Sequence, residues 1–123
     1  MDRRKALIRE YKENQPPAGI FQIKNLVNGK VFIGKGLNVQ GKINGNQMQL
    51  KLGSHRTKAL QEDWNTYGPE QFSFEVLDYL EDDGGPFRNQ QKELAALEEM
   101  WLDKLQPYGE KGYNRKPRKH VKF

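Results

Sequence analysis

The sequence contains no cysteine, which excludes disulfide bonds and thiolate metal sites. It also lacks any long apolar run, since its longest uninterrupted apolar stretches are only a handful of residues. Such stretches are too short for a transmembrane helix or for the apolar core of a signal peptide. These absences predict a soluble protein of a reducing compartment, the cytoplasm, with no membrane as a partner.

Acidic residues are absent from positions 14–61, a stretch that carries seven Lys or Arg side chains. Positions 62–110 reverse this balance with thirteen acids against three bases, and positions 111–123 again hold only bases. Because a solvated surface normally mixes both signs, this segregation indicates an anionic partner. The alternative is chance clustering of ordinary solubilising lysines. A membrane surface is disfavoured, because no segment joins these bases to a continuous apolar face.

The length of 123 residues suits one domain with a modest core. The sequence of its first half predicts a helix, a hairpin and a loop. A charged helix is expected over residues 2–13. A β-hairpin follows over about residues 19–34, with an Asn-Gly pair at its turn, which is a strong two-residue turn signal. Three glycines disfavour a helix over residues 35–46, so we expect a loop there and a short extended piece at 48–52.

The second half predicts two helices around a strand. Ser54 is expected to cap a helix that ends at Gly68, and alternating Phe72, Phe74 and Val76 predict a third strand. Pro86 is expected to open the last helix, whose apolar stripe ends before Pro107. The order ββ–α–β–α predicts an α/β (α+β) sandwich with a three-stranded, mostly antiparallel sheet flanked by helices.

Glu98 is out of place in this last helix. With about 100° of rotation per residue, it lies on the same face as Leu94 and Leu105. A carboxylate on a core-facing stripe needs a partner, since burying it alone is costly. One explanation is an edge residue bonded to a backbone donor, to Arg56 or to Lys42. The other is a ligand for Mg²⁺, which favours hard oxygen donors.

Two triplets flank the Asn-Gly pair, Gly-Ile-Phe at 19–21 and Phe-Ile-Gly at 32–34. They resemble the paired Gly-Ile-Tyr and Tyr-Ile-Gly signature of the GIY-YIG nuclease family. The other motifs follow in that family's order, namely His55 at the head of a helix, Trp-Asn-Thr-Tyr-Gly at 64–68, the strand at 72–77, Glu98 with Trp101, and Gly-Tyr-Asn at 112–114.

The resemblance implies a GIY-YIG-like domain over residues 18–114, between an N-terminal helical extension at 1–17 and a basic tail at 115–123. It also implies metal-assisted hydrolysis of DNA phosphodiesters. In that family one tyrosine helps to activate water, a second supports the phosphate and an arginine neutralises charge. By this resemblance Glu98 is the ligand of Mg²⁺ or Mn²⁺, Asn114 buttresses the site and His55 is the site histidine.

The chain departs from the family's pattern at its proton-transfer groups. Both motif tyrosines are phenylalanine, Phe21 and Phe32, and a phenyl ring cannot transfer a proton. No arginine lies between positions 9 and 56, so the charge-neutralising role falls to Lys42 or to Arg56. A lysine supplies a point charge but not a bidentate fork.

Lys35 and His55 are the remaining groups able to assist a water. Lys35 suits a phosphate contact better than a base unless it is desolvated. The ordinary alternative for His55 is a polar residue in the first turn of its helix. Further contacts to nucleic acid are expected from bases of the hairpin, the second helix and the tail: Lys30, Lys58, Arg115, Lys116, Arg118 and Lys119.

The sequence is therefore consistent with two functions from different classes. The first is an altered endonuclease that cuts DNA with Glu98, a divalent metal and the remaining basic groups. The second is a nucleic-acid-binding module of the same fold that has lost cleavage, because general acid–base catalysis typically contributes about 10²–10⁴-fold. A purely structural interaction domain is a third alternative that the charge segregation disfavours.

Overall fold

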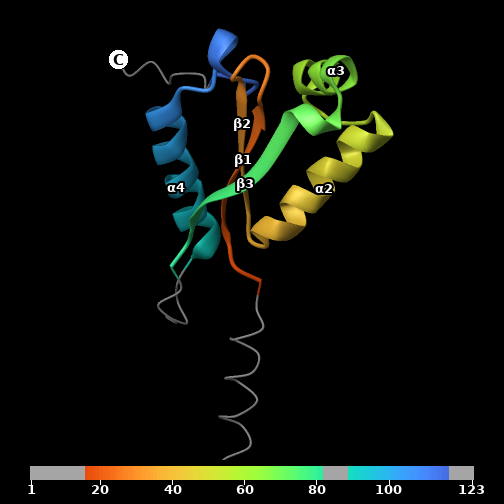
Figure 1. Cartoon of the computed structure of the whole chain (residues 1–123). Helices are drawn as coiled ribbons and strands as arrows, with labels where there is room; N and C mark the ends of the chain where they lie inside the picture. Colours follow the sequence, from red (N-terminus) through yellow and green to blue (C-terminus); the bar gives the residue numbers. More distant parts are fainter. Residues whose placement is uncertain (1–15, 82–88, 117–123) are drawn as a thin grey trace, which may run out of the picture.

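A three-stranded antiparallel sheet forms the centre of the structure, a computed structural model that describes residues 16–81 and 89–116 (Figure 1). Strand β1 (Gly19–Asn25) lies between β2 (Val31–Gly36) and β3 (Phe72–Tyr79) and pairs antiparallel with both. The predicted α+β class and the predicted sheet are therefore confirmed. The helix expected over residues 2–13, Pro86 and the end of the tail lie outside the described residues.

The sheet is covered on both faces because its strands direct apolar side chains to each face. Phe21 and Ile23 of β1 enter one core cluster, whereas Ile20 and Ile33 enter another. Helices must therefore pack on both faces of the sheet to keep these apolar side chains from water. None of the helices in the described residues has the length and apolarity needed to cross a lipid bilayer.

Helices α2 (Val39–Leu52) and α3 (Lys58–Tyr67) cover the first face (Figure 1). Their buried side chains complete a core of nine residues: Phe21, Ile23, Val39, Ile43, Leu50, Leu60, Trp64, Phe72 and Tyr113. The ring of Trp64 packs on Phe72 with 5.3 Å between centroids, which ties α3 to the start of β3. A 3₁₀ turn, η1 (Pro69–Gln71), joins them.

Helix α4 (Gln90–Leu105) is the one helix of the described residues that covers the opposite face (Figure 1). The predicted apolar stripe is confirmed, because Leu94 is buried and Leu97, Trp101 and Leu105 pack against the same cluster. The helix begins after the cap Asn89, whose side chain accepts a hydrogen bond from the Lys92 backbone. Gln106 ends it in the left-handed region.

The prediction of a loop at residues 35–46 and an extended piece at 48–52 is wrong, because α2 occupies most of this stretch. Asn38 caps the helix through a bond from Gly41, and Gly53 ends it with a positive φ of 75°. Helical spacing directs Val39, Ile43 and Leu50 into the core. Burial of that face outweighs the weak helix propensity of the two glycines inside the helix.

Two further boundaries differ from expectation. Helix α3 begins at Lys58 after Thr57, not after Ser54, whose backbone N–H instead bonds the Gln49 carbonyl at the end of α2. The hairpin connection spans residues 26–30 rather than two residues. Only Gly29 of the Asn-Gly pair has a positive φ, so the tight turn that needs both residues there does not form.

The segment after α4 returns along the free edge of β2. A short 3₁₀ turn, η2 (Gly109–Lys111), leads to a parallel bridge between Gly112 and Val31. The backbone N–H of Tyr113 donates to the Val31 carbonyl at 2.9 Å. This contact brings the C-terminal part of the described chain to the sheet edge that also faces α2.

Candidate active site

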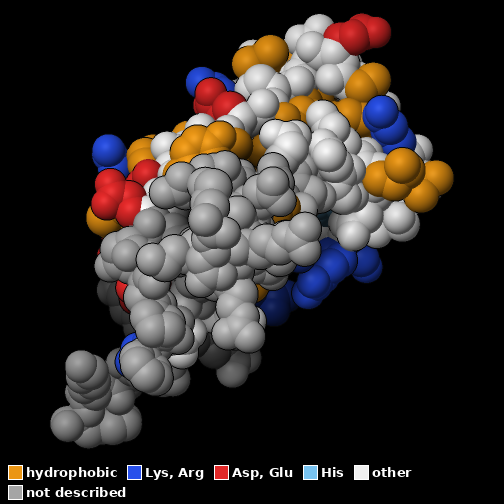
Figure 2. All heavy atoms as spheres, turned by 90° about the horizontal axis from the view of Figure 1, so that it is seen from below, with side chains coloured by type: hydrophobic (Ala, Val, Ile, Leu, Met, Phe, Trp, Pro, Cys, Tyr) orange, Lys and Arg blue, Asp and Glu red, His pale blue; other side chains and the backbone are white. Residues whose placement is uncertain are grey.

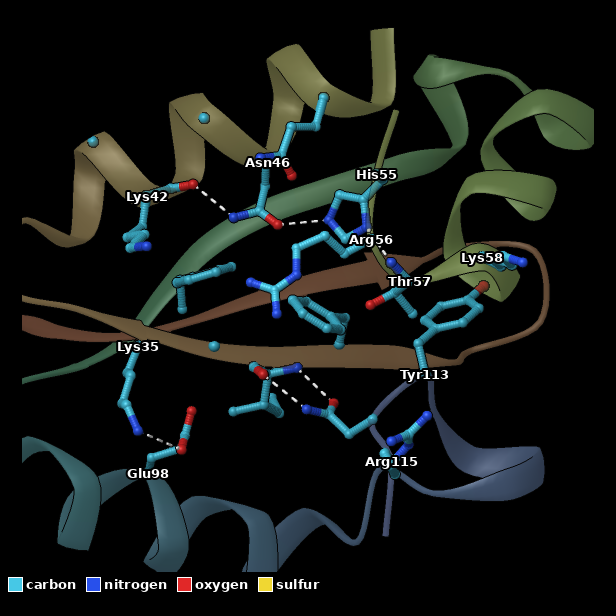
Figure 3. A pocket seen from close by; sticks show the side chains of 18 residues that line it. Lys35, Lys42, Asn46, His55, Arg56, Thr57, Lys58, Glu98, Tyr113 and Arg115 are labelled. Atoms are coloured by element: carbon cyan, nitrogen blue, oxygen red, sulfur yellow. Dashed lines mark hydrogen bonds and ion pairs between the residues drawn. The ribbon is translucent and has the colours of Figure 1, made fainter. Parts of the chain in front are cut away.

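An open pocket of about 1220 Å³ lies between β2, α2 and the loop that joins α2 to α3 (Figure 3). It gathers most of the residues that the sequence singled out, from positions that lie far apart along the chain. The predicted site residues in its lining are Phe21, Phe32, Lys35, Lys42, His55, Arg56, Lys58, Glu98, Asn114 and Arg115.

The pocket is strongly basic. Among the described residues that line it, five carry Lys or Arg side chains and Glu98 is the single acid. In Figure 3 the side chain of Arg56 extends into the middle of the pocket, and Lys42 points down from α2 toward β2. Figure 2 shows the molecule from below the view of Figure 1. A group of Lys and Arg side chains lies at the lower right of this face, away from most of its Asp and Glu side chains. Such an arrangement attracts a polyanion.

Phe21 and Phe32 form the apolar floor of this pocket. Their rings lie 6.3 Å apart between centroids at a 50° tilt, and Phe21 is 2% exposed. The register that pairs Phe21 with Gly34 places this ring over a glycine without a side chain. Neither ring carries a hydroxyl, so the floor packs well but moves no proton.

Glu98 forms an ion pair with Lys35 at the lower wall of the pocket (Figure 3). The Lys35 Nζ atom lies 3.2 Å from Glu98 Oε1, and the two side chains are 43% and 23% exposed. Lys35 is thus the partner that a carboxylate on an apolar stripe requires, in place of the backbone donor, Arg56 or Lys42 considered from the sequence.

His55 is held by two hydrogen bonds that define its tautomer. Its Nδ1 accepts from the Thr57 backbone N–H at 3.0 Å, and its Nε2 lies 2.7 Å from Asn46 Oδ1. Asn46 donates through Nδ2 to the Lys42 carbonyl, which leaves its oxygen to face the ring. The Nε2–H tautomer therefore satisfies both contacts, and its one lone pair is already occupied.

The surroundings of His55 favour the neutral ring. Burial, with a smaller contribution from the charge of Arg56, lowers its pKa below the usual value. The ring also meets Phe32 edge-on, 5.7 Å between centroids. His55 precedes α3 instead of lying in its first turn. In this conformation it stabilises the loop that carries Arg56, and it has no free nitrogen to accept a proton from water.

Asn114 is bound to the edge of β2 by both atoms of its amide. Its Oδ1 accepts from the Ile33 N–H at 2.8 Å, and its Nδ2 donates to the Ile33 carbonyl at 2.9 Å. The side chain thus imitates one residue of a neighbouring strand. This geometry fits a residue that holds the pocket wall in place and does not touch a substrate itself.

Tyr113, Asn46 and Gln49 also line the pocket, and sequence reasoning assigned them no role. The Tyr113 hydroxyl donates to Asp63 at 2.6 Å and accepts from the fully buried Asn25 at 3.0 Å. Burial, followed by the Asp63 hydrogen bond, raises the Tyr113 pKa to about 12. The signal available from the sequence was only the Gly-Tyr-Asn motif at 112–114.

The remaining predicted contacts are not lining residues of the pocket, although Lys30 contacts one of those residues. The Lys30 ammonium lies over the Tyr113 ring, 5.7 Å from its centroid, at the hairpin end of the molecule. Lys116 is exposed just beyond Arg115. Arg118 and Lys119 lie outside the described residues. The pocket therefore accounts for Lys58 and Arg115 among these six bases.

A divalent ion fits this site only if the protein supplies part of its coordination shell and waters or phosphates supply the rest. Within residues 16–81 and 89–116, no three His, Cys, Asp or Glu side chains cluster into a site formed by protein alone. Mg²⁺, however, commonly uses one or two carboxylates and completes its shell with waters and substrate phosphates. Glu98, on the wall of a pocket that suits phosphates, can supply that single carboxylate.

No protein-family model and no curated protein sequence matches the chain. Solved structures do resemble it. The catalytic domain of the homing endonuclease I-TevI matches with a TM-score of 0.65 and 26% identity, over 81% of this chain and 99% of that one. A mutant of the same domain gives 0.64 and 26%, over 80% and 92%. The sequence resemblance is confirmed: the chain has the fold of a GIY-YIG nuclease catalytic domain.

Proposed function

We propose that the pocket binds the phosphodiester backbone of nucleic acid, DNA above all, and hydrolyses it slowly with Mg²⁺ or Mn²⁺ held by Glu98. The observation that carries this proposal is the meeting of five basic side chains and one carboxylate in one open pocket. The resemblance to an endonuclease catalytic domain supports the same reaction class.

The basic side chains have separate tasks in this proposal. Lys42 and Arg56 reach into the pocket from opposite sides of its upper wall, where they can neutralise a phosphate and the charge that develops on it (Figure 3). Arg56 offers the bidentate fork that a lysine lacks. Lys58 and Arg115 lie toward the other end of the pocket, where they can contact the backbone on one side of the scissile group (Figure 3).

When bound, a divalent ion would polarise the phosphate and stabilise the leaving oxygen as a Lewis acid. The described residues of the pocket supply little help with proton transfer. Phe21 and Phe32 have no hydroxyl, and the His55 lone pair is occupied by the Thr57 N–H. Since general acid–base help is typically worth about 10²–10⁴-fold, hydrolysis by this site should be slow.

A second candidate function is binding without cleavage. The phenyl floor favours it, because the two rings preserve packing while removing the hydroxyls that the family's signature provides. In that case Glu98 serves as the partner of Lys35 and the pocket only holds a phosphate backbone. Both candidates share the binding step and differ in whether a divalent ion leads to strand breakage.

Binding is tested by fluorescence anisotropy with labelled DNA at several salt concentrations. Each phosphate contact should contribute about 0.9 to the slope of log K against log salt for a duplex. The triple variant Lys42→Gln, Arg56→Gln, Arg115→Gln should reduce that slope by about 2–3 and weaken binding.

A matched variant, Lys24→Gln, Lys51→Gln, Lys111→Gln, loses the same charge from exposed positions outside the pocket lining. It should retain most of the wild-type slope. Equal losses in the two triple variants would show that net charge, and not this pocket, binds the nucleic acid. A wild-type affinity that does not change with salt would contradict the proposed partner altogether.

A further inference from the structure

Glu98, the single acid that the described residues contribute to the pocket lining, already forms an ion pair with Lys35. Glu98 reaches the pocket from α4, and Lys35 reaches it from β2, directly after the Phe-Ile-Gly triplet. Their charged atoms lie 3.2 Å apart, with Lys35 the more exposed of the two. Figure 3 shows the pair at the lower wall, away from Arg56 and Lys42.

A divalent ion and the Lys35 ammonium compete for the same carboxylate. A positive charge about 4 Å from a divalent ion weakens its binding by roughly three- to thirtyfold in a well-solvated site. The paired form of Glu98 is therefore a poor site for a metal ion. It becomes a better one when Lys35 is drawn away.

A phosphate is the group that can draw Lys35 away. Lys35 is 43% exposed at the edge of a pocket with four other bases, where a phosphodiester would be held. Its flexible stem lets the ammonium move from a carboxylate to a phosphate without any change in the backbone. The same phosphate can then complete the shell of an ion at Glu98.

We propose that Lys35 couples metal binding to nucleic-acid binding, so that Glu98 binds a divalent ion more tightly once a phosphate backbone occupies the pocket. This inference rests on the proposed function and adds an order to it. The free protein should bind metal weakly, which limits strand breakage and metal scavenging in the absence of substrate. By linkage, the metal must raise nucleic-acid affinity by the same factor.

The test is Mn²⁺ binding, followed by the electron paramagnetic resonance signal of free Mn²⁺. Wild type, Lys35→Gln, Glu98→Gln and the control Lys51→Gln are titrated with and without a short phosphorothioate DNA duplex. Lys51 is an exposed lysine of α2 outside the pocket lining. Glu98→Gln with the duplex measures the Mn²⁺ that the DNA alone binds.

We expect wild type and Lys51→Gln to bind Mn²⁺ about tenfold more tightly with the duplex than without it. Lys35→Gln should bind Mn²⁺ about tenfold more tightly than wild type without duplex, and gain little more when the duplex is added. In wild type, saturating Mn²⁺ should raise duplex affinity by the same factor of about ten, measured by anisotropy.

Equal Mn²⁺ affinities for wild type and Lys35→Gln without duplex would overturn the coupling. If Glu98→Gln still weakened Mn²⁺ binding in the titrations without duplex, the metal site of the proposed function would stand, but the coupling through Lys35 would not. If Glu98→Gln bound Mn²⁺ like wild type in every state, the metal site itself would be wrong, and the coupling with it.

Discussion

The ring of Phe21 lies directly over Gly34 of the neighbouring strand, where a Cβ atom at Gly34 would come within 2.6 Å of the Phe21 Cε1 atom. The two residues belong to the two triplets that the sequence analysis paired. Their contact gives a physical reason for the glycine of the second triplet, because any side chain there would displace the pocket floor.

Gly34→Ala should therefore destabilise the fold by about 1–3 kcal/mol, the usual cost of forcing extra volume into a packed core. Gly45→Ala is the matched control, since a Cβ at Gly45 meets nothing within 4 Å and alanine is the better helix former. It should be neutral or stabilise by up to about 1 kcal/mol. Urea unfolding measures both, and equal stability of the two variants would refute the contact.

The buried hydroxyl of Tyr113 makes a second prediction. Tyr113→Phe removes the acceptor of the fully buried Asn25 amide and the donor to Asp63. An unpaired buried polar group costs about 1–3 kcal/mol, so the free energy of unfolding should fall by that amount. Tyr79→Phe, at a 54% exposed position, should change it by less than about 0.5 kcal/mol. Equal effects would show that the network contributes nothing.

His55 predicts a dependence of stability on pH. Its pKa is lowered in the folded state by burial, so the unfolded chain takes up a proton first as the pH falls. Stability is therefore complete above the ordinary histidine value of 6.5 and is lost progressively below it. Thermal unfolding between about pH 7.5 and pH 5 should show this decline.

The chain has one other histidine, His120, which serves as the control. His55→Gln should flatten the decline below pH 6.5, whereas His120→Gln should leave it in place. A slope that survives in His55→Gln would mean that other groups, and not the neutral ring of His55, cause the pH dependence.

The sequence predicted the sheet and α4 because their apolar patterns are strong. The apolar run of β1 reflects burial on both faces of the sheet, whereas the alternation of β3 and the stripe from Leu94 to Leu105 each reflect burial against one core cluster. Helix α2 was missed because glycine, asparagine and glutamine make up half of its residues, although Val39, Ile43 and Leu50 keep helical spacing. A local propensity argument cannot weigh the packing that this sparse stripe gains against the sheet.

The sequence predicted in outline which residues converge on the pocket, because ordered motifs identify them, but it did not predict how they bond. The pairing of Lys35 with Glu98 and the two hydrogen bonds between Asn114 and Ile33 depend on the β2 register and on the path of the last segment. The tautomer of His55 depends on Asn46, which lies on the helix that was not predicted. Side-chain partners of this kind follow from tertiary geometry.

In the proposed function, a pocket on a nuclease fold binds DNA and cuts it slowly because its floor has no hydroxyl groups. Supercoiled plasmid incubated with Mg²⁺ or Mn²⁺ tests it directly, with wild type, Phe32→Tyr, the double variant Phe21→Tyr, Phe32→Tyr, and each with Glu98→Gln. Phe32 is half-buried, so its added hydroxyl has room, whereas the tighter Phe21 site is restored only in the double variant.

We expect slow nicking by wild type and about tenfold or greater acceleration in the tyrosine variants. Glu98→Gln should abolish nicking in every background. Protein that binds the plasmid yet leaves it intact in all variants and with both metals would contradict hydrolysis and leave binding without cleavage. Nicking that survives Glu98→Gln would contradict the assignment of Glu98 as the metal ligand.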